Sequence, residues 1–366
     1  MIATPDDSDS AAADETVVAL NIERRRNVPV STVLEVAASG GALRSVQVSS
    51  PEGDLAGAIS DDESSWTAGD RLEPGTKYTV RTVAEGDAGT SRSTTTFWTQ
   101  ALTLDEQTYP SVAPLDGETV GIGMPVVVTF DLPVRDQAAF EEQMTVTSTP
   151  SQKGAWHWLS ATEAHYRPAT YWKPGTEVDV AIDVNGLDAG NGIYGQENRD
   201  ISFDVGKAHI YRVNAETHQM KVFENGKLLR TFPITTGKPG FTTRSGVKVI
   251  MEKFESRRMN SETVGIPAGS SESYDIDNVQ WAMRLTNSGE FIHAAPWSVG
   301  SQGSANVSHG CTGMSTADAG WLYAMSRRGD VVEYTGTDRP MEFDNGYGDW
   351  NMSFARYARG SALVSR

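Results

Sequence analysis

The stretch Leu72-Glu73-Pro74-Gly75-Thr76-Lys77-Tyr78-Thr79-Val80 returns at an offset of 100 residues as Trp172-Lys173-Pro174-Gly175-Thr176-Glu177-Val178-Asp179-Val180. In each copy a Pro-Gly turn precedes alternating apolar and polar residues, which is the pattern of a β-strand with one buried face. A further strand is predicted after each copy, at 95–98 and at 201–205. Short strands and frequent turns over about 100 residues are typical of an Ig-like β-sandwich, so the sequence predicts two of them in tandem.

Changes in composition and residue pattern along the chain predict five segments. They are a flexible leader at 1–15, an Ig-like domain at 16–100, a second Ig-like domain at 101–206, a third domain at 207–336 and a C-terminal extension at 337–366. Two prolines in 108–115 predict a short, stiff hinge between the sandwiches. The extension carries Trp350, Met352, Phe354 and Tyr357 at a helix-like spacing, and we expect it to pack on the other domains.

The balance of charge narrows the classes of partner. The 366 residues include 31 Lys and Arg against 48 Asp and Glu, which gives a net charge of −17. Nucleic acid and anionic lipid surfaces are themselves negative, so neither is expected as a partner. No apolar run approaches the roughly 18 residues that cross a bilayer. Residues 1–15 lack the basic and apolar regions of a signal peptide.

The third domain is predicted to be mostly β with one helix. Asn225-Gly226 between two strand-like runs is the strongest short hairpin signal. Ser315 and Asp318 resemble a capping box that opens a helix, which we expect to run to Gly329. The strands are predicted at 221–224, 227–231, 247–251, 291–293 and 331–334.

The chain has a single cysteine, Cys311, in the string Ser308-His309-Gly310-Cys311. A polar loop with a glycine is an unusual place for a structural cysteine, and a lone cysteine forms no disulfide within its chain. A thiol becomes a good nucleophile only when a base or a positive field removes its proton. His293, at the end of a predicted strand, is the expected base, and His309 is expected to assist it or to brace the loop.

Two further features favour acyl transfer at Cys311. The positive end of the helix that opens at Ser315 would favour a thiolate if the loop folds back onto it. The backbone N–H groups of Gly310, Cys311 and Thr312 would form an oxyanion hole, which acyl transfer requires.

Two alternatives to catalysis remain. One is a buried structural cysteine, and the other is a zinc site made by His293, His309 and Cys311, although no CxxC or HExxH spacing supports zinc. The remaining histidines lack a catalytic arrangement and are expected to be structural: His157, His165, His209 and His218.

Two strings around these residues are similar to a family signature. The first reads Ile292-His293-Ala294-Ala295-Pro296-Trp297-Ser298-Val299-Gly300, and the second reads Asn306-Val307-Ser308-His309-Gly310-Cys311. Both closely resemble the signature of the L,D-transpeptidases of mycobacteria and related actinobacteria. The resemblance extends upstream through 154–160 and 172–176, so it covers the second sandwich and the third domain. It implies an L,D-transpeptidase catalytic domain at 207–336, behind two Ig-like domains.

The resemblance also implies the reaction. Cys311 would attack the carbonyl between diaminopimelate and D-alanine in a peptidoglycan stem tetrapeptide, and D-alanine would leave a thioester behind. The side-chain amine of diaminopimelate on a second stem would then form a 3→3 cross-link. His293 would be the general base and acid, oriented by the backbone carbonyl of Ala294, and His309 matches the second family histidine. No cofactor or metal is implied, and carbapenems would acylate the same sulfur.

A flap over the site is implied as well, from Met259 to Tyr274. These two residues would line the donor pocket, although packing is the alternative for several members of the predicted set. The substrate-binding residues implied by the resemblance are Met259, Tyr274, Ser288, Phe291, Trp297, Asn306 and Ser308. Two positions depart from the family: Gly313 stands where many members have Asn, and Val264 stands where the flap has an aromatic residue.

The sequence also leads to expectations about the function of the protein and its location in the cell. The alternatives to cross-linking are an L,D-carboxypeptidase, in which water replaces the acceptor amine, and a wall-binding scaffold that has lost catalysis. We expect the chain to act outside the cytoplasm at the cell wall, as a monomer. We expect it to be anchored through an N-terminal segment absent from this sequence, with the sandwiches as spacers.

Overall fold

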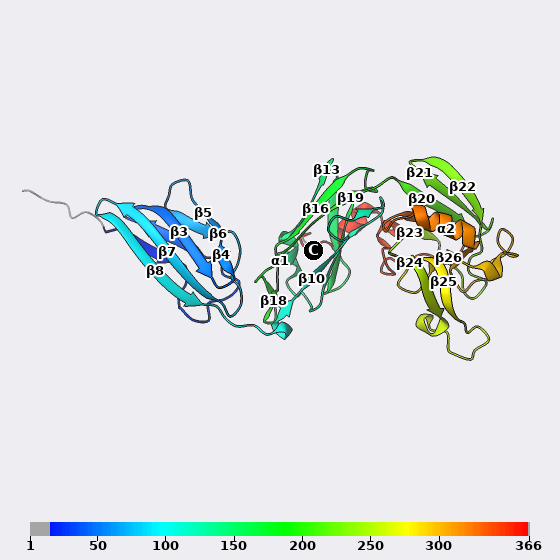
Figure 1. The fold of residues 1–366 in the computed structure, drawn as a ribbon, viewed down its shortest axis with the longest axis horizontal. Helices are drawn as coiled ribbons and strands as arrows, with labels where there is room; N and C mark the ends of the chain where they lie inside the picture. The colour runs from blue at the N-terminus through cyan, green and yellow to red at the C-terminus, as the bar shows by residue number, and fades with distance from the viewer. Residues whose placement is uncertain (1–14, 365–366) are drawn as a thin grey trace, which may run out of the picture. The chain divides into compact units, whose positions relative to one another are not determined.

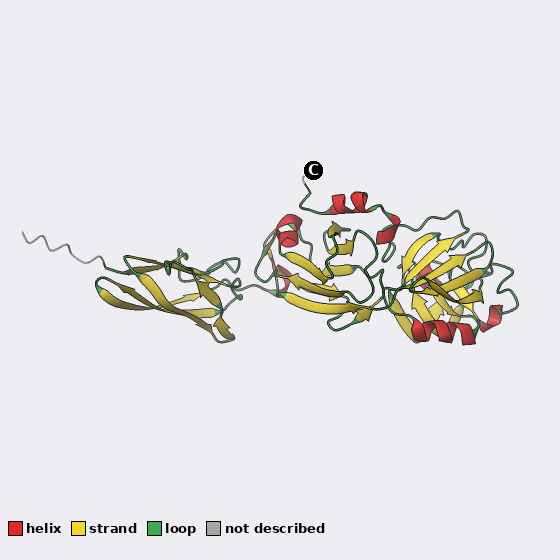
Figure 2. Cartoon of the chain, turned by 90° about the horizontal axis from the view of Figure 1, so that it is seen from above, coloured by secondary structure: helices red, strands yellow, loops and turns green. Residues whose placement is uncertain are grey.

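The computed structural model describes residues 15–364, and strands dominate it (Figures 1 and 2). The mainly β fold predicted from the sequence is confirmed. By its internal contacts the chain divides into two compact units. Among the described residues, the first holds 15–110, Asp131–Phe140 and Asp183–Asn198, and the second holds Ser111–Phe130, Glu141–Ile182 and 199–364. The leader predicted at 1–15 lies outside the described residues except for Glu15.

The first sandwich has two antiparallel sheets of four strands. One contains, in spatial order, β1 (Val17–Leu20), β2 (Glu35–Ser39), β6 (Ser65–Ala68) and β5 (Gly57–Ile59), and the other contains β4 (Gly53–Leu55), β3 (Ala42–Ser50), β7 (Lys77–Gly86) and β8 (Gly89–Trp98). The strand predicted from the repeat is β7, and Tyr78, Val80 and Thr82 are buried along one face of it. Gly75 in the preceding turn has a φ of +62°, a backbone conformation that residues other than glycine rarely adopt.

The second sandwich also has two sheets of four strands, but β11 and β19 in it pair in parallel. One sheet contains β10 (Pro110–Ala113), β12 (Val126–Phe130), β15 (Glu163–Pro168) and β14 (Gly154–Trp158), and the other contains β11 (Thr119–Val120), β19 (Arg199–Val205), β16 (Glu177–Ile182) and β13 (Met144–Thr149). The second copy of the repeat forms β16, where Val178, Val180 and Ile182 are buried as predicted.

The hinge predicted at 108–115 is wrong, because this segment supplies strands. It contains β10 and the end of β9 (Gln107–Thr108). Proline is compatible with β10 because this strand lies at a sheet edge, where a missing N–H costs no ladder hydrogen bond. The first unit also contains η1 (Leu104–Glu106) and a small sheet of β17 (Asp188–Gly190), β18 (Ile193–Gly195) and β9, while α1 covers Gln137–Glu142.

The third domain has two sheets and the longest helix of the described chain. The first sheet contains β22 (Lys227–Pro233), β21 (Gln219–Glu224), β20 (His209–Asn214), β28 (Val331–Thr335) and β23 (Gly246–Val249), and the second contains β24 (Glu252–Asn260), β25 (Asp275–Arg284), β26 (Phe291–Ala294) and β27 (Thr312–Met314). Helix α2 (Thr316–Met325) packs on β25 and β26 (Figure 1). Both sheets and α2 contribute to one buried core, which includes Tyr211, Val222, Ile292, Met314 and Leu322.

Local signals in this domain predicted the hairpin and the start of the helix. Asn225 and Gly226 have φ values of +48° and +80°, as the turn of a two-residue hairpin requires. The Ser315 hydroxyl accepts the Asp318 N–H at 3.1 Å and caps α2. The predicted end at Gly329 is wrong, because α2 ends at Met325. Ser326 has an extended backbone conformation, and its hydroxyl and N–H both donate to the Leu322 carbonyl.

The C-terminal extension contacts the second sandwich through short helices. They are η4 (Asp349–Asn351), α3 (Phe354–Tyr357) and η5 (Ala358–Gly360). His157 on β14 donates to the Tyr357 carbonyl at 2.8 Å, and His165 on β15 lies 3.0 Å from the Asp349 carboxylate. The guanidinium of Arg167 on β15 stacks over Tyr357 and donates to a carbonyl of the extension. Both histidines thus hold the extension in place.

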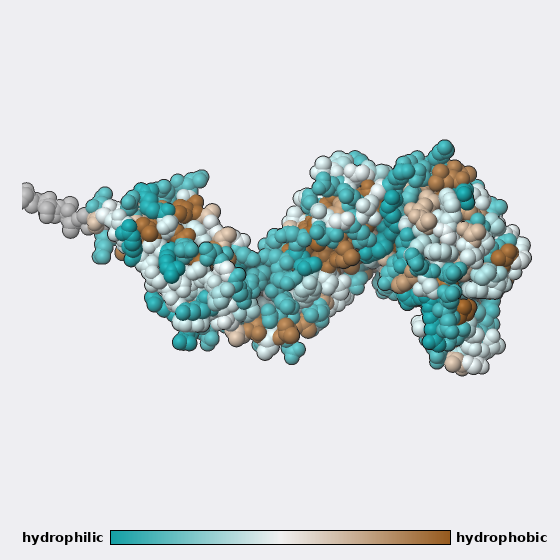
Figure 3. Space-filling view, viewed as in Figure 1, coloured by the Kyte–Doolittle hydropathy of each residue, from teal (hydrophilic) through white to brown (hydrophobic). Residues whose placement is uncertain are grey.

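The surface agrees with the acidic, polar composition. The face shown in Figure 3 is mostly hydrophilic, and its hydrophobic areas are small and separate. Among residues 15–364, no helix is both long enough and apolar enough to cross a membrane.

Candidate active site

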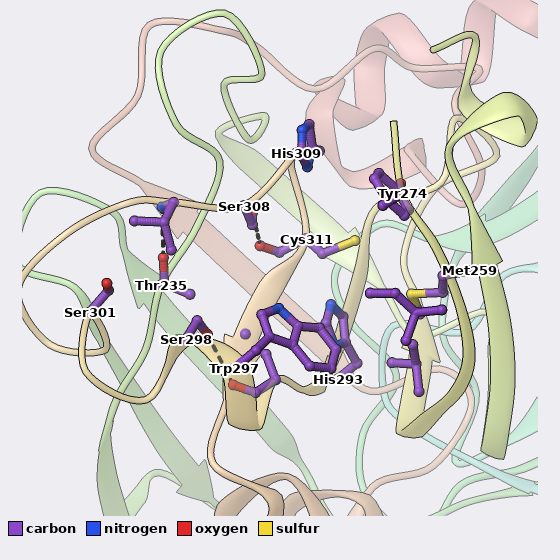
Figure 4. A pocket seen from close by; sticks show the side chains of 15 residues that line it. Thr235, Met259, Tyr274, His293, Trp297, Ser298, Ser301, Ser308, His309 and Cys311 are labelled. Atoms are coloured by element: carbon purple, nitrogen blue, oxygen red, sulfur yellow. Dashed lines mark hydrogen bonds between the residues drawn. The ribbon is translucent and has the colours of Figure 1, made fainter. Parts of the chain in front are cut away.

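Two parallel strands place the predicted base and nucleophile on one face of a sheet. β26 and β27 pair with Ile292 opposite Thr312 and His293 opposite Gly313. Cys311 precedes β27 and therefore lies level with Phe291, two positions from His293. Side chains two positions apart on a strand share a face, so the thiol and the imidazole point to the same side. Both line a cavity of about 530 Å³ (Figure 4).

The loop that carries Cys311 is fixed by its own hydrogen bonds. The Ser308 hydroxyl donates to the Cys311 carbonyl at 2.6 Å and accepts the Gly310 N–H at 3.1 Å. The Thr243 hydroxyl holds the Gly310 carbonyl at 2.7 Å. Gly310 has a φ of +124°, which explains a glycine at this position. Because the Gly310 N–H is already bonded, it is not a free oxyanion donor in this structure.

His293 is held in one tautomer. It is only 6% exposed, and its Nδ1 lies 2.8 Å from the Ala294 carbonyl, the contact implied for the base. A carbonyl only accepts hydrogen bonds, so Nδ1 carries a proton and the neutral ring has its lone pair on Nε2. Burial lowers the pKa of His293, although the bond to Ala294 partly opposes this. The imidazole is therefore neutral near pH 7 and able to accept a proton.

The Cys311 thiol is neutral in the resting site as well. Burial is the main reason that its pKa rises to about 12, and the nearby Glu290 carboxylate adds to the rise. The thiol also points at the Gly289 carbonyl, with the sulfur 3.6 Å from the oxygen. Both effects disfavour the thiolate, so the resting pair is a thiol beside a neutral imidazole rather than an ion pair.

The predicted help from the dipole of α2 is wrong. Extended chain, including β27, separates Cys311 from the cap at Ser315, and four extended residues span roughly 13 Å. The dipole acts mainly within the first turn of a helix. The loop does not fold back onto the helix, so the sulfur lies outside its field.

His309 links the Cys311 loop to the flap. We use "flap" for residues 259–274, which include η2 (Ser261–Val264) and lead into β25. The Nε2 of His309 lies 2.7 Å from the Glu272 carboxylate, and its ring contacts Tyr274 at 5.1 Å between centroids. Lys238 also bonds to Glu272, at 2.5 Å. His309 therefore lines the cavity while bonded to a flap carboxylate.

Most of the predicted substrate-binding residues surround the sulfur. Met259 and Tyr274 form the flap wall of the larger cavity, and Trp297 in η3 (Pro296–Ser298) forms the opposite wall with 57% of its surface exposed. Ser308 lines it too. In Figure 4 the sulfur of Cys311 points towards the flap side. A second cavity of about 210 Å³ opens there, shares Cys311, Met259 and Tyr274 with the first, and contains Phe291 in its wall.

Ser288 and Asn306 lie outside the linings of these two cavities. Asn345 bonds to Ser288 through its side chain. The Asn306 side chain accepts the Thr236 N–H at 3.1 Å and donates to the Ala215 carbonyl at 3.0 Å. Asn306 thus braces the loop before Cys311. These positions do not support the predicted contacts with substrate.

Gly313 is a packed position rather than a vacant one. A Cβ here would lie 2.9 Å from the Thr235 methyl group and 3.0 Å from the Ala295 Cβ. The space that an Asn side chain would need is therefore filled from two sides. Val264 packs directly against Gly289. A Cβ on Gly289 would lie only 2.4 Å from one methyl group of Val264. Both departures from the family are accommodated by their neighbours.

The sequence did not reveal a group of buried charges beneath the Cys311 loop. Lys248 is fully buried and donates to Glu290. The Glu290 carboxylate also accepts a hydrogen bond from the Arg244 guanidinium at 3.0 Å. The Lys248 ammonium lies 3.8 Å from the centre of the Tyr334 ring, whose hydroxyl bonds to Thr312 at 2.7 Å. A lysine inside an apolar strand was the available signal, but its partner is 42 residues away in sequence.

The zinc alternative does not match the placement of its ligands. His293 directs Nδ1 at a carbonyl, and His309 directs Nε2 at Glu272. Within residues 15–364, no group of three or more His, Cys, Asp and Glu side chains is placed to hold a metal ion.

Comparison with known proteins gives two family matches and several relatives. Residues 25–188 match the bacterial Ig domain family, and residues 208–333 match the L,D-transpeptidase catalytic domain family. The chain is 36% identical over 337 residues to L,D-transpeptidase 2 of Mycobacterium tuberculosis, which covers 92% of this chain and 82% of the relative.

Two solved structures are also similar. The LD transpeptidase LdtMt1 in complex with imipenem is 37% identical to this chain, with a TM-score of 0.54. The similarity covers 62% of this chain and 97% of the LdtMt1 chain. L,D-transpeptidase 3 from Mycobacterium tuberculosis, in complex with a faropenem-derived adduct, has 29% identity and a TM-score of 0.52, with 62% and 97% covered.

Proposed function

Because the chain belongs to the L,D-transpeptidase family and is an L,D-transpeptidase, we propose that Cys311 and His293 carry out its acyl transfer. The observation that carries this proposal is the shared face of the β26–β27 pair, from which both side chains enter one cavity. No other cysteine exists in the chain to serve as nucleophile.

The first step moves one proton and exchanges one bond. His293 accepts the Cys311 proton on Nε2 as the sulfur attacks the carbonyl between diaminopimelate and D-alanine of a stem tetrapeptide. The sulfur–carbon bond forms, the carbon–nitrogen bond breaks, and the proton passes from His293 to the departing amine. The N–H groups of Cys311 and Thr312 are the remaining candidates to stabilise the oxyanion, since that of Gly310 is bonded to Ser308.

The second step is aminolysis of the thioester. The amine of diaminopimelate on another stem attacks, His293 accepts its proton, and the thiol is restored with a 3→3 cross-link as product. Carboxypeptidase activity would follow the same path with water as the acceptor.

The setting of the reaction is part of the proposal. We propose that the protein acts outside the cytoplasm, where stem peptides are cross-linked, as a monomer anchored at its N-terminal side, with the Ig-like domains as spacers. The imipenem complex and the faropenem adduct of the relatives support covalent inhibition of this chain by β-lactams, at the same sulfur.

Product analysis tests the proposed function. Purified protein is incubated with disaccharide tetrapeptide stems, and products are separated and weighed by mass spectrometry. We expect cross-linked dimers and free D-alanine from the wild type, and neither from Cys311→Ala. Free tripeptide stems without dimers would assign the carboxypeptidase instead. No turnover and no β-lactam adduct on folded protein would favour the scaffold.

A further inference from the structure

The smaller cavity beside Cys311 differs in chemistry from the larger one. Its wall contains three arginines, Arg257 and Arg258 from β24 and Arg284 from β25, and no Asp or Glu. The larger cavity has no Lys or Arg in its wall and is mainly apolar. A positive cavity that reaches the sulfur stands out in a chain with a net charge of −17.

Two of the three arginines are neutralised by carboxylates nearby. Arg258 pairs with Asp275 at 2.5 Å and with Asp277 at 3.3 Å, and all three side chains are exposed. Arg284 pairs with Glu252 at 2.8 Å, across the β24–β25 ladder. Their positive charges are therefore already matched within the protein.

Arg257 has no such match. No carboxylate within the described residues 15–364 pairs with it, and its guanidinium lies over the rings of Phe254 at 4.4 Å and Phe291 at 5.4 Å. Aromatic faces attract and orient a guanidinium but offer no acceptor in its plane, so the N–H groups of the half-buried Arg257 remain available to a carboxylate. Phe291 is 5% exposed and begins β26, the strand that also carries His293, so Arg257 is held on rigid structure beside the reacting pair.

We infer that Arg257 binds a carboxylate of the substrate in the smaller cavity, next to the carbonyl that Cys311 attacks. This inference rests on the proposed function. The sulfur lies where the two cavities meet, so the groups on either side of the attacked carbonyl occupy different cavities. A cavity of about 210 Å³ takes a small terminal part of the substrate and not a whole stem peptide. A guanidinium fork matches a carboxylate in shape and charge.

Two substrate carboxylates lie beside the amine that leaves or attacks this carbonyl. One is the C-terminal carboxylate of the D-alanine that leaves from the donor, and the other is a free carboxylate on the diaminopimelate of the acceptor. The donor arm of the experiment compares two tetrapeptides that differ only in a C-terminal carboxylate or carboxamide. The acceptor arm compares acceptor stems whose diaminopimelate carboxylate is free or amidated, with one common donor.

The readout is kcat/KM for release of the leaving group and for dimer formation. In one of the arms we expect the wild type to prefer the carboxylate by about 10- to 100-fold, the contribution of one charge-assisted hydrogen bond. Arg257→Gln should abolish that preference, and Arg257→Lys should retain part of it. Arg258→Gln is the matched control, since it removes a neighbouring arginine that is already paired, and should keep the preference.

Each outcome decides a different question. Equal kcat/KM for both members of both pairs in the wild type overturns the inference, and loss of the preference in Arg258→Gln as well overturns the assignment to Arg257. Turnover of neither donor overturns the proposed function instead. In that case equilibrium binding of both pairs to Cys311→Ala decides the subsite: a Kd ratio near one in each pair overturns it, and an Arg257-dependent preference supports it.

Discussion

Replacing His293 with glutamine shows whether the site starts from a neutral thiol. With a pKa of about 12, roughly one Cys311 thiol in 10⁵ is ionised at pH 7, so the wild type depends on His293 to remove the proton. We expect His293→Gln to lower the acylation rate by about 10²- to 10⁴-fold near pH 7, the usual contribution of a general base. The rate of this variant should then rise about tenfold per pH unit, as the thiolate fraction does.

The wild type should behave differently with pH. Burial lowers the pKa of His293 below 6.5, so its imidazole stays neutral above that pH and loses activity only in more acidic solution. The assay is the rate of covalent adduct formation with a carbapenem, followed by intact mass from pH 5 to pH 9. His309→Gln is the control, and its profile should keep the wild-type shape because His309 bonds to Glu272. A wild-type profile retained in His293→Gln would refute the reasoning.

Three further predictions concern packing and charge. Gly313→Asn should cost about 1–3 kcal/mol of stability in urea unfolding, because it overpacks the site, and adding Thr235→Ser, which removes the methyl group 2.9 Å away, should restore part of it. Glu290→Gln should cost about 3–5 kcal/mol, since it leaves the Lys248 charge buried beside a neutral partner; adding Lys248→Met should recover most of this in the same assay. Burial opposes protonation of His165, but its two carboxylate partners raise its pKa to about 9. Its stabilisation is therefore complete below pH 6.5 and lost as the pH rises through about 9. His165 should contribute a fall of about 3 kcal/mol in the unfolding free energy over that range, and this contribution should be missing from the pH profile of His165→Gln.

Local rules were enough for much of the fold. The Pro-Gly turns predicted β7 and β16, Asn225-Gly226 predicted a hairpin, and Ser315 predicted the start of α2, because each depends on the conformation of a few adjacent residues. The same rules failed where the neighbours decide. Pro110 fits a strand because β10 lies at a sheet edge, and the end of α2 depends on the side chain of Ser326.

The site shows the same division. The histidine and cysteine strings identified Cys311 and His293, but the register that puts them on one face is a pairing between strands distant in sequence. The bond from Gly310 to Ser308, the filled space at Gly313 and the unmatched charge of Arg257 also depend on residues brought together by folding. Sequence spacing carries no information on such contacts, so they required the structure.

The most direct test of acyl transfer at Cys311 is the mass of the protein shortly after mixing with a stem tetrapeptide donor and no acceptor. We predict a gain equal to the donor minus D-alanine, located by peptide mapping on the fragment that contains Cys311 and absent from Cys311→Ala. The same gain in Cys311→Ala, or its location on any other residue, would contradict the assignment of the nucleophile.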